Sequence, residues 1–173
     1  EQALELGFNG IRMHQKIEAP AFLFWCDALG LLVWQDIPTG YLPSTKLRDE
    51  HRRLLMDTID RDRAHPSIVI WVPFNETWGI HDILLSARTR DFVRETVQVI
   101  KDSDPSRPVI DNSGFEHVDT DILDLHHYLG TVDDCRKYYN ELDDPTRLEF
   151  TISNLVTRFN VAREPVRDRK STR

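Results

Sequence analysis

The sequence has no long hydrophobic run, a deficit of positive charge and few cysteines. Hydrophobic residues make up 40% of its 173 positions, and none of their runs approaches the roughly 18 residues that cross a membrane. We therefore expect a soluble chain with no membrane partner. The first residues also lack the basic start and the apolar core of a secretory signal. A signal lying upstream would change that interpretation, so the cytoplasm and secretion both stay open.

The charge balance argues against nucleic acid as a partner. Lys and Arg number 22 and Asp and Glu 29, a net charge of −7, which is the wrong sign for binding a phosphate backbone. The two cysteines, Cys26 and Cys135, show no CxxC or Cys/His metal spacing. Because Cys26 falls on an apolar helix face, we expect buried free thiols and neither a metal nor a cofactor.

Apolar strands alternate with amphipathic helices as far as Tyr128, which is typical of an α/β protein. Helices are predicted at 20–30, 44–59 and 84–100, and the first of them carries Phe22, Trp25, Cys26 and Leu29 at helical spacing. Strands are predicted at 10–13, 31–34, 68–72, 108–110 and 122–125. Beyond Tyr128 the pattern decays.

Polar side chains follow each predicted strand. They are Arg12 and His14, Gln35 and Asp36, Asn75 and Glu76, Asp111 and Asn112, and finally His126, His127 and Tyr128. Strands that are apolar on both faces and joined by helices form a parallel sheet, so these residues share one rim. In a (β/α)₈ barrel this rim holds the active site, whereas an open doubly wound sheet would show a glycine-rich phosphate turn, which is missing. A complete barrel has about 250 residues and eight strands, so we predict a partial (β/α)₈ TIM barrel with about five strands.

The charge distribution divides the chain. We assign residues 1–146 to the partial catalytic barrel and residues 147–173, with seven Lys and Arg against three Asp and Glu, to a weakly patterned basic tail. Its last residues, 168–173, resemble the translation of a sequencing adapter. We interpret them as an artefact of a truncated reading frame.

Five blocks, taken in order, resemble the central part of the catalytic barrel of glycoside hydrolase family 2, the β-galactosidase, β-glucuronidase and β-mannosidase group. The blocks are GFNGIRMH, DALGLLVWQDIP, HPSIVIWVPFNETWG, RPVIDNSG and DILDLHHY. The Asn-Glu pair alone is shared with a wider clan of barrel glycosidases, but the ordered set is specific. The resemblance implies a retaining glycosidase acting on β-linked sugars without a metal, with β-sandwich domains upstream of the barrel.

The resemblance also implies residue roles. Glu76 matches the general acid/base and Asn75 the residue that contacts the sugar 2-hydroxyl, while Tyr128 matches a tyrosine near the nucleophile. Pocket-lining positions are matched by Arg12, His14 and Asp36. The nucleophile of the family is a second Glu after a later strand, and no segment here matches it, so the chain alone is expected to be an inactive fragment.

Elementary chemistry agrees with these roles. A carboxyl group holds a proton near neutral pH only if burial or a neighbouring carboxylate raises its pKa, so we expect a raised pKa for Glu76. Retaining hydrolysis also needs a second carboxylate about 5 to 5.5 Å away. Trp78 and Tyr128 are predicted to offer aromatic faces to the sugar, and His127 is a further predicted substrate contact.

Each assignment has a structural alternative. Asn75 could cap a following helix, with Glu76 favouring its positive end. Arg12 and His14 could form a structural pair below the rim, and Asp36 could only support other groups. A core position is the expectation for Trp25, Trp34 and Trp71.

Two other functions stay open. A metal-dependent barrel hydrolase would use His14, His126 or His127 with Asp111, although the HxH and HxxxH spacings are missing and adjacent strand histidines point to opposite faces. A noncatalytic carbohydrate-binding barrel would keep Trp78 and tolerate the loss of Glu76.

Overall fold

Strands and helices alternate along the chain in a computed structural model that describes residues 1–41, 44–142, 144 and 146. The elements are α1 (Gln2–Glu5), β1 (Gly10–Met13), α2 (Pro20–Leu29), β2 (Leu32–Asp36), α3 (Thr45–Asp62), β3 (Ile68–Val72), β4 (Phe74–Asn75), α4 (Ala87–Ser103), β5 (Asn112–Ser113) and α5 (Val132–Leu142). The tail prediction for 147–173, including 168–173, lies outside the described residues. No helix in the described part is long and apolar enough to cross a membrane.

The strands are all parallel, as predicted. One sheet has the order β1–β2–β3, β4 pairs with β5, and a bridge between Trp71 and Val109 links the two pieces. Parallel pairing brings the carboxyl ends of the strands to one edge. The strands follow one another in chain order across the sheet, as in a TIM barrel, and within the described residues the sheet stays open.

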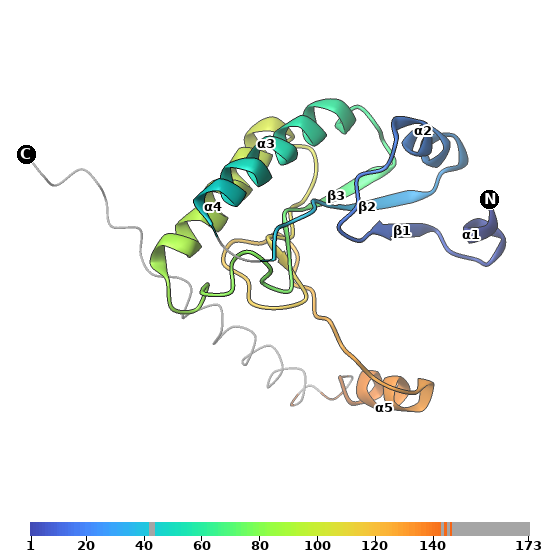
Figure 1. The fold of residues 1–173 in the computed structure, drawn as a ribbon. Helices are drawn as coiled ribbons and strands as arrows, with labels where there is room; N and C mark the ends of the chain where they lie inside the picture. The colour runs from blue at the N-terminus through green and yellow to red at the C-terminus, as the bar shows by residue number, and fades with distance from the viewer. Residues whose placement is uncertain (42–43, 143, 145, 147–173) are drawn as a thin grey trace, which may run out of the picture.

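Helices α3 and α4 run side by side against the sheet (Figure 1). Their apolar faces, with Leu55, Ile59 and Val97, pack on Val33 and Trp71 in the main core. Each helix starts at a serine whose side chain accepts a backbone N–H three residues on, which satisfies one of the free donors of the first turn. The two helices therefore form a fixed backing for the strand ends.

The last two strand predictions are only partly right. Strand β5 begins at Asn112, and 108–110 contributes only the single bridge at Val109. Residues 122–125 are not a strand, although His126 N–H donates to the carbonyl of Gly114 just beyond them. Leu123 and Leu125 stay exposed because no described element covers them. Helix α5, which the sequence pattern did not predict, follows residues 119–131, a segment without helix or strand that we call the arm and that projects from the sheet (Figure 1).

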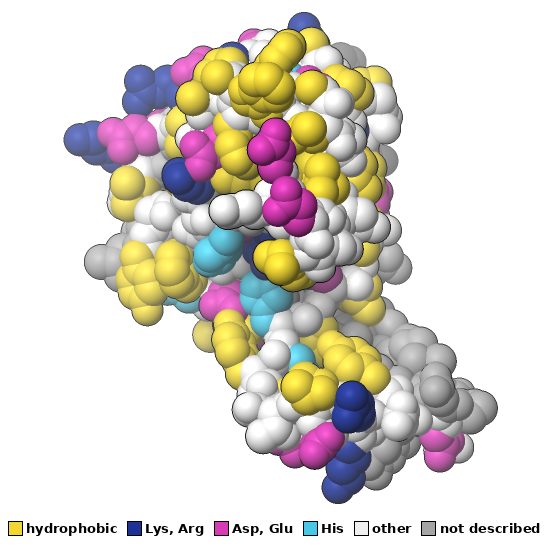
Figure 2. All heavy atoms as spheres, turned by 90° about the vertical axis from the view of Figure 1, so that its right-hand side faces the viewer, with side chains coloured by type: hydrophobic (Ala, Val, Ile, Leu, Met, Phe, Trp, Pro, Cys, Tyr) yellow, Lys and Arg dark blue, Asp and Glu magenta, His cyan; other side chains and the backbone are white. Residues whose placement is uncertain are grey.

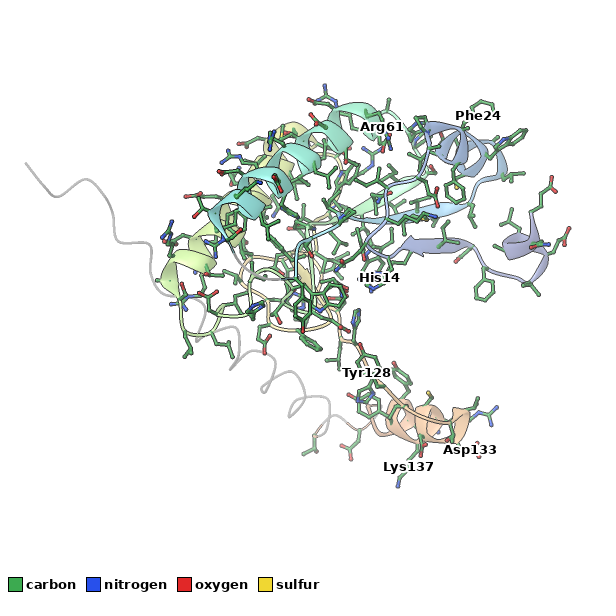
Figure 3. The ribbon with its side chains drawn as sticks, in the orientation of Figure 1. His14, Phe24, Arg61, Tyr128, Asp133 and Lys137 are labelled. Carbon is green, nitrogen blue, oxygen red and sulfur yellow. The ribbon has the colours of Figure 1, made fainter. Side chains whose placement is uncertain are left out.

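The tryptophans divide between core and surface. Trp71 is fully buried and its indole N–H donates to Asp104, as expected for a core residue. The prediction for Trp25 is wrong: it is 60% exposed and packs edge to face on Phe24, which points outward from α2 (Figure 3). The buried face of α2 instead carries Leu23 and Cys26. Trp34 is half-buried beneath the guanidinium of Arg12, and the free thiol of Cys135 is only partly buried.

Candidate active site

A buried carboxylate and an arginine form the base of the site. Asp36, the last residue of β2, is 1% exposed. Arg12 of β1 donates from Nε and Nη2 to both of its oxygens at 2.8 to 3.1 Å. This bidentate geometry holds the guanidinium in one orientation. His14 Nδ1 lies 3.1 Å from Asp36 Oδ2, so the predicted pocket residues of these two strands meet.

The same arginine fixes the amide of Asn75. Arg12 Nη2 donates to Asn75 Oδ1 at 2.7 Å, and Asn75 is buried. The next long helix begins only at Ala87 and is capped by Ser86, so the alternative in which Asn75 caps a helix is wrong. With its oxygen turned to Arg12, Asn75 keeps its NH₂ group for another partner.

The backbone at Glu76 is in an uncommon conformation. Glu76 and Thr77 have φ values of +47° and +60°, in the left-handed region, where each non-glycine residue costs about 1 to 3 kcal/mol. Two hydrogen bonds from the neighbouring strand region hold this turn: Glu76 N–H donates to the Ser113 carbonyl at 3.0 Å, and Thr77 N–H donates to Asn112 Oδ1 at 2.9 Å. Asn112, predicted at the rim, thus serves to pin the turn that carries Glu76.

Two side chains from the segment after β5 reach the Glu76 carboxylate. His126 Nδ1 lies 2.7 Å from Glu76 Oε1, and the Tyr128 hydroxyl donates to the same oxygen. Tyr128 lies below His14, on the segment that leads to α5 (Figure 3). Figure 2 shows histidine side chains beside an acidic group in the middle of one face, above the lobe formed by the arm.

These donors decide the charge of Glu76. Burial on its own raises the pKa of Glu76, but the hydrogen bonds from Tyr128 and His126 together with the field of His14 outweigh it, so the pKa is lowered. Our expectation of a raised pKa is therefore wrong for the described residues. The physical reason is that hydrogen-bond donors contact this carboxylate, whereas no carboxylate in the described ranges does. The Tyr128 pKa is raised because its hydroxyl donates to the carboxylate.

The two adjacent histidines have different neighbours. His126 reaches Glu76, whereas the exposed His127 packs its ring on Tyr138 of α5 with centroids 3.9 Å apart. The structure therefore does not bring the predicted substrate contact His127 to the site. His126 was missing from the predicted substrate contacts, although residues two apart in an extended segment share a face and Tyr128 was among them.

The remaining predicted residues lie in separate surroundings. Trp78 is partly buried and packs edge to face on Tyr41, with ring centroids 5.5 Å apart. Asp111 is fully buried, binds His117 Nδ1 at 2.7 Å and accepts two backbone N–H groups. Of the residues of the metal-dependent alternative, Asp111 is thus bound by His117 and His127 packs on Tyr138. The described part of the chain contains no cluster of three or more His, Cys, Asp or Glu suited to a metal.

Parallel strands that gather an arginine, an amide and a carboxylate at their carboxyl ends define the chain as part of a TIM-barrel domain. Residues 3–155 match the TIM barrel domain of glycosyl hydrolases family 2. The chain belongs to this family, which confirms the resemblance read from the five blocks.

Individual relatives agree with the family. The chain is 26% identical over 153 residues to a putative β-glucuronidase of Formosa agariphila, covering 84% of this chain and 18% of that protein. It is 29% identical over 163 residues to a β-galactosidase of Thermoanaerobacterium thermosulfurigenes, covering 90% and 21%. The solved β-glucuronidase of Parabacteroides merdae superimposes with a TM-score of 0.67 at 25% identity over 79% of this chain and 19% of that one. The chain thus spans about a fifth of the length of these relatives.

Proposed function

We propose that these residues supply the acid/base half of the active site of a retaining glycosidase that hydrolyses O-glycosidic bonds of β-linked sugars. The observation that carries the proposal is the placement of Glu76 in a strained turn at the strand ends, beside the buried Asn75 and under two hydrogen-bond donors. Backbone strain of this kind persists where surrounding structure enforces it, which favours a catalytic over a noncatalytic role. The names of the relatives support a β-linked substrate.

In this proposal Glu76 serves in both steps of the reaction. Its carboxylic acid first gives a proton to the glycosidic oxygen while a second carboxylate attacks the anomeric carbon and the C–O bond breaks. Its carboxylate then takes a proton from the water that cleaves the glycosyl ester. The NH₂ group of Asn75, turned away from Arg12, is suited to donate to the sugar 2-hydroxyl as the ring flattens.

The lowered pKa of Glu76 fits the second step. The charge of an ionised nucleophile nearby would raise this pKa before the first step, because two neighbouring carboxylates resist ionising together. Once the nucleophile is esterified that charge is gone. The donors His126 and Tyr128 then favour the ionised form of Glu76, which is the base that the second step needs.

We further propose that the nucleophile and upstream β-sandwich domains belong to parts of a longer enzyme outside this sequence. No segment of this sequence matches the second Glu that the family resemblance implies as the nucleophile. The length of the relatives, about five times the matched span, supports the same proposal.

Replacement of Glu76 by Gln in the complete enzyme tests the acid role. We expect the glycosylation rate to fall about 10²- to 10⁴-fold for alkyl β-glycosides, whose leaving group needs a proton. The rate should fall much less for dinitrophenyl β-glycosides, whose leaving group departs as a stable anion. Equal loss on both substrates would contradict an acid role for Glu76.

A second experiment tests where the nucleophile lies. Residues 1–173 alone should show no turnover of aryl β-galactoside, β-glucuronide or β-mannoside, since Glu76 without a nucleophile cannot trap the oxocarbenium-like centre. Turnover that disappears in Glu76→Ala would show that the second catalytic group is within this chain.

A further inference from the structure

His126 lies between two groups that determine which of its ring nitrogens carries hydrogen. Its Nε2 is 2.7 Å from Arg12 Nη1, and its Nδ1 is 2.7 Å from Glu76 Oε1. A guanidinium has only donors, so the Nε2 facing it must be the bare acceptor. The hydrogen of a neutral ring then sits on Nδ1 and points at Glu76. A doubly protonated ring would direct an N–H at the guanidinium.

The other groups around His126 confine its ring to one position. A Cβ on Gly114 would lie 2.3 Å from His126 Cγ, so the ring rests directly on the glycine backbone. Ser113 Oγ is 3.2 Å from Nε2 and donates its own hydrogen to Asp124 Oδ2 at 2.5 Å. Ser113 Oγ therefore cannot donate to Nε2, and its lone pair alone would favour a hydrogen there. The guanidinium of Arg12 is closer, at 2.7 Å, and has only hydrogens to offer, so it decides that Nε2 is the acceptor.

The two oxygens of Glu76 are not equivalent in this arrangement. Oε1 accepts hydrogen bonds from His126 and from the Tyr128 hydroxyl. A carboxylate oxygen that already accepts two hydrogen bonds has little lone-pair capacity left for a proton. The proton of the acid form is therefore expected on Oε2.

We propose that His126 is a positioning residue, a neutral imidazole with its hydrogen on Nδ1 that anchors Oε1 of Glu76 so that Oε2 exchanges the proton with the leaving group. The proposal rests on the acid/base role proposed above for Glu76. It also assigns a role to the Asp36–Arg12 pair. Asp36 orients the guanidinium of Arg12, and an N–H of this guanidinium sets the tautomer of His126. Arg12 and Asp36 thereby influence which oxygen of Glu76 carries the proton, and they do so through His126 without contacting the leaving group.

The tautomer can be read without any assay of activity. In the complete enzyme labelled with ¹⁵N-histidine, two-bond ¹H–¹⁵N correlations near neutral pH should give His126 the pattern of a neutral Nδ1–H ring. The signal is assigned by its loss in His126→Asn. A neutral Nε2–H ring or a doubly protonated ring would overturn the proposal, whatever the enzyme hydrolyses.

Two matched variants test the positioning role. His126→Leu removes the donor, whereas His126→Asn keeps an N–H close to the place of Nδ1. For alkyl β-glycosides we expect His126→Leu to lower kcat about 10- to 100-fold with a smaller change in KM, because one hydrogen bond to a charged group is lost. The His126→Asn variant should keep most of the kcat of the parent enzyme. The glycosylation rate on dinitrophenyl glycosides should change little in either variant.

The pH profile separates this role from a merely structural one. The alkaline limb of the pH profile of kcat/KM should move to higher pH in the His126→Leu variant, because a donor that lowers the pKa of Glu76 is lost. In the His126→Asn variant it should return toward the position seen in the parent enzyme. The proposal would be overturned if the alkaline limb did not move in His126→Leu, or if His126→Leu and His126→Asn gave the same pH profile. If the parent enzyme hydrolyses no β-glycoside, the proposed function fails instead, and the NMR result still decides the tautomer.

Discussion

The two halves of the site are held in different ways. Asp36 and Asn75 are buried at the ends of strands backed by α3 and α4. His126 and Tyr128 lie on the arm, residues 119–131, where Tyr128 is 79% exposed. Packing and the Arg12–Asp36 pair fix the first half, while hydrogen bonds to Glu76, Ser113 and Gly114 and the contact of the His126 ring with Gly114 fix the second. The arm should therefore open locally at lower free energy than the strand ends.

The largest effect is expected from Arg12→Ala, which tests the strand half. It leaves the carboxylate of Asp36 buried without its bidentate partner, and breaking a buried pair in this way costs about 3 to 5 kcal/mol. Urea unfolding measures the loss. The matched control is Lys101→Ala, because the pair of Lys101 with Asp121 is about a third exposed on both sides and should contribute under about 1 kcal/mol. Similar losses in both variants would remove the distinction between a buried strand end and the surface.

A smaller effect is expected from Gly114→Ala, which tests the seat of the arm. The new methyl group would meet the His126 ring at 2.3 Å, on a backbone with φ of +89°. Overpacking of this kind costs about 1 to 3 kcal/mol and should displace His126 from Glu76. Thermal unfolding of Gly130→Ala is the control, since nothing lies within 4 Å of the Cβ it would gain. Equal melting temperatures for the two variants would show that the ring does not rest on Gly114.

The buried pair of His117 with Asp111 at the base of the arm predicts a dependence on pH. Burial lowers the pKa of His117, but the hydrogen bond and charge of Asp111, with the contribution of Asp124, outweigh it and raise the pKa above 6.5. A raised folded-state pKa gives stability that is complete below the unfolded value and is lost as pH rises through the folded one. As the pH rises above about 6.5 and through the raised pKa of the folded state, the parent should lose stability relative to His117→Asn. A difference in unfolding free energy that stays constant with pH would contradict a charged His117.

The smallest effect is expected from His127→Ala, at the outer end of the arm. Its ring packs only on Tyr138 of α5 among the described rings, and an aromatic pair contributes about 0.5 to 1.5 kcal/mol. The loss in unfolding free energy should lie within this range, and kcat should stay close to that of the parent. A large fall in kcat would contradict this prediction and would show that His127, and with it the outer part of the arm, contributes to substrate binding or catalysis.

Local patterns in the sequence determined the secondary structure of most of the chain and the half of the site on the strands. Apolar runs that end in polar residues place Arg12, Asp36 and Asn75 at one rim, because parallel strands share a direction and their carboxyl ends meet. The helix start at Ser44 was equally readable, since a serine ahead of an amphipathic run supplies the first-turn acceptor.

Only the tertiary structure decided the half of the site on the arm. Whether His126 or His127 reaches Glu76 depends on how an extended segment is rotated, and the contact that sets it joins residues 50 positions apart. The lowered pKa of Glu76 and the exposure of Trp25 are of the same kind, because both follow from which neighbours are present. Periodicity in a sequence reports which face of an element is apolar, whereas the partner of each face is a property of the packed chain.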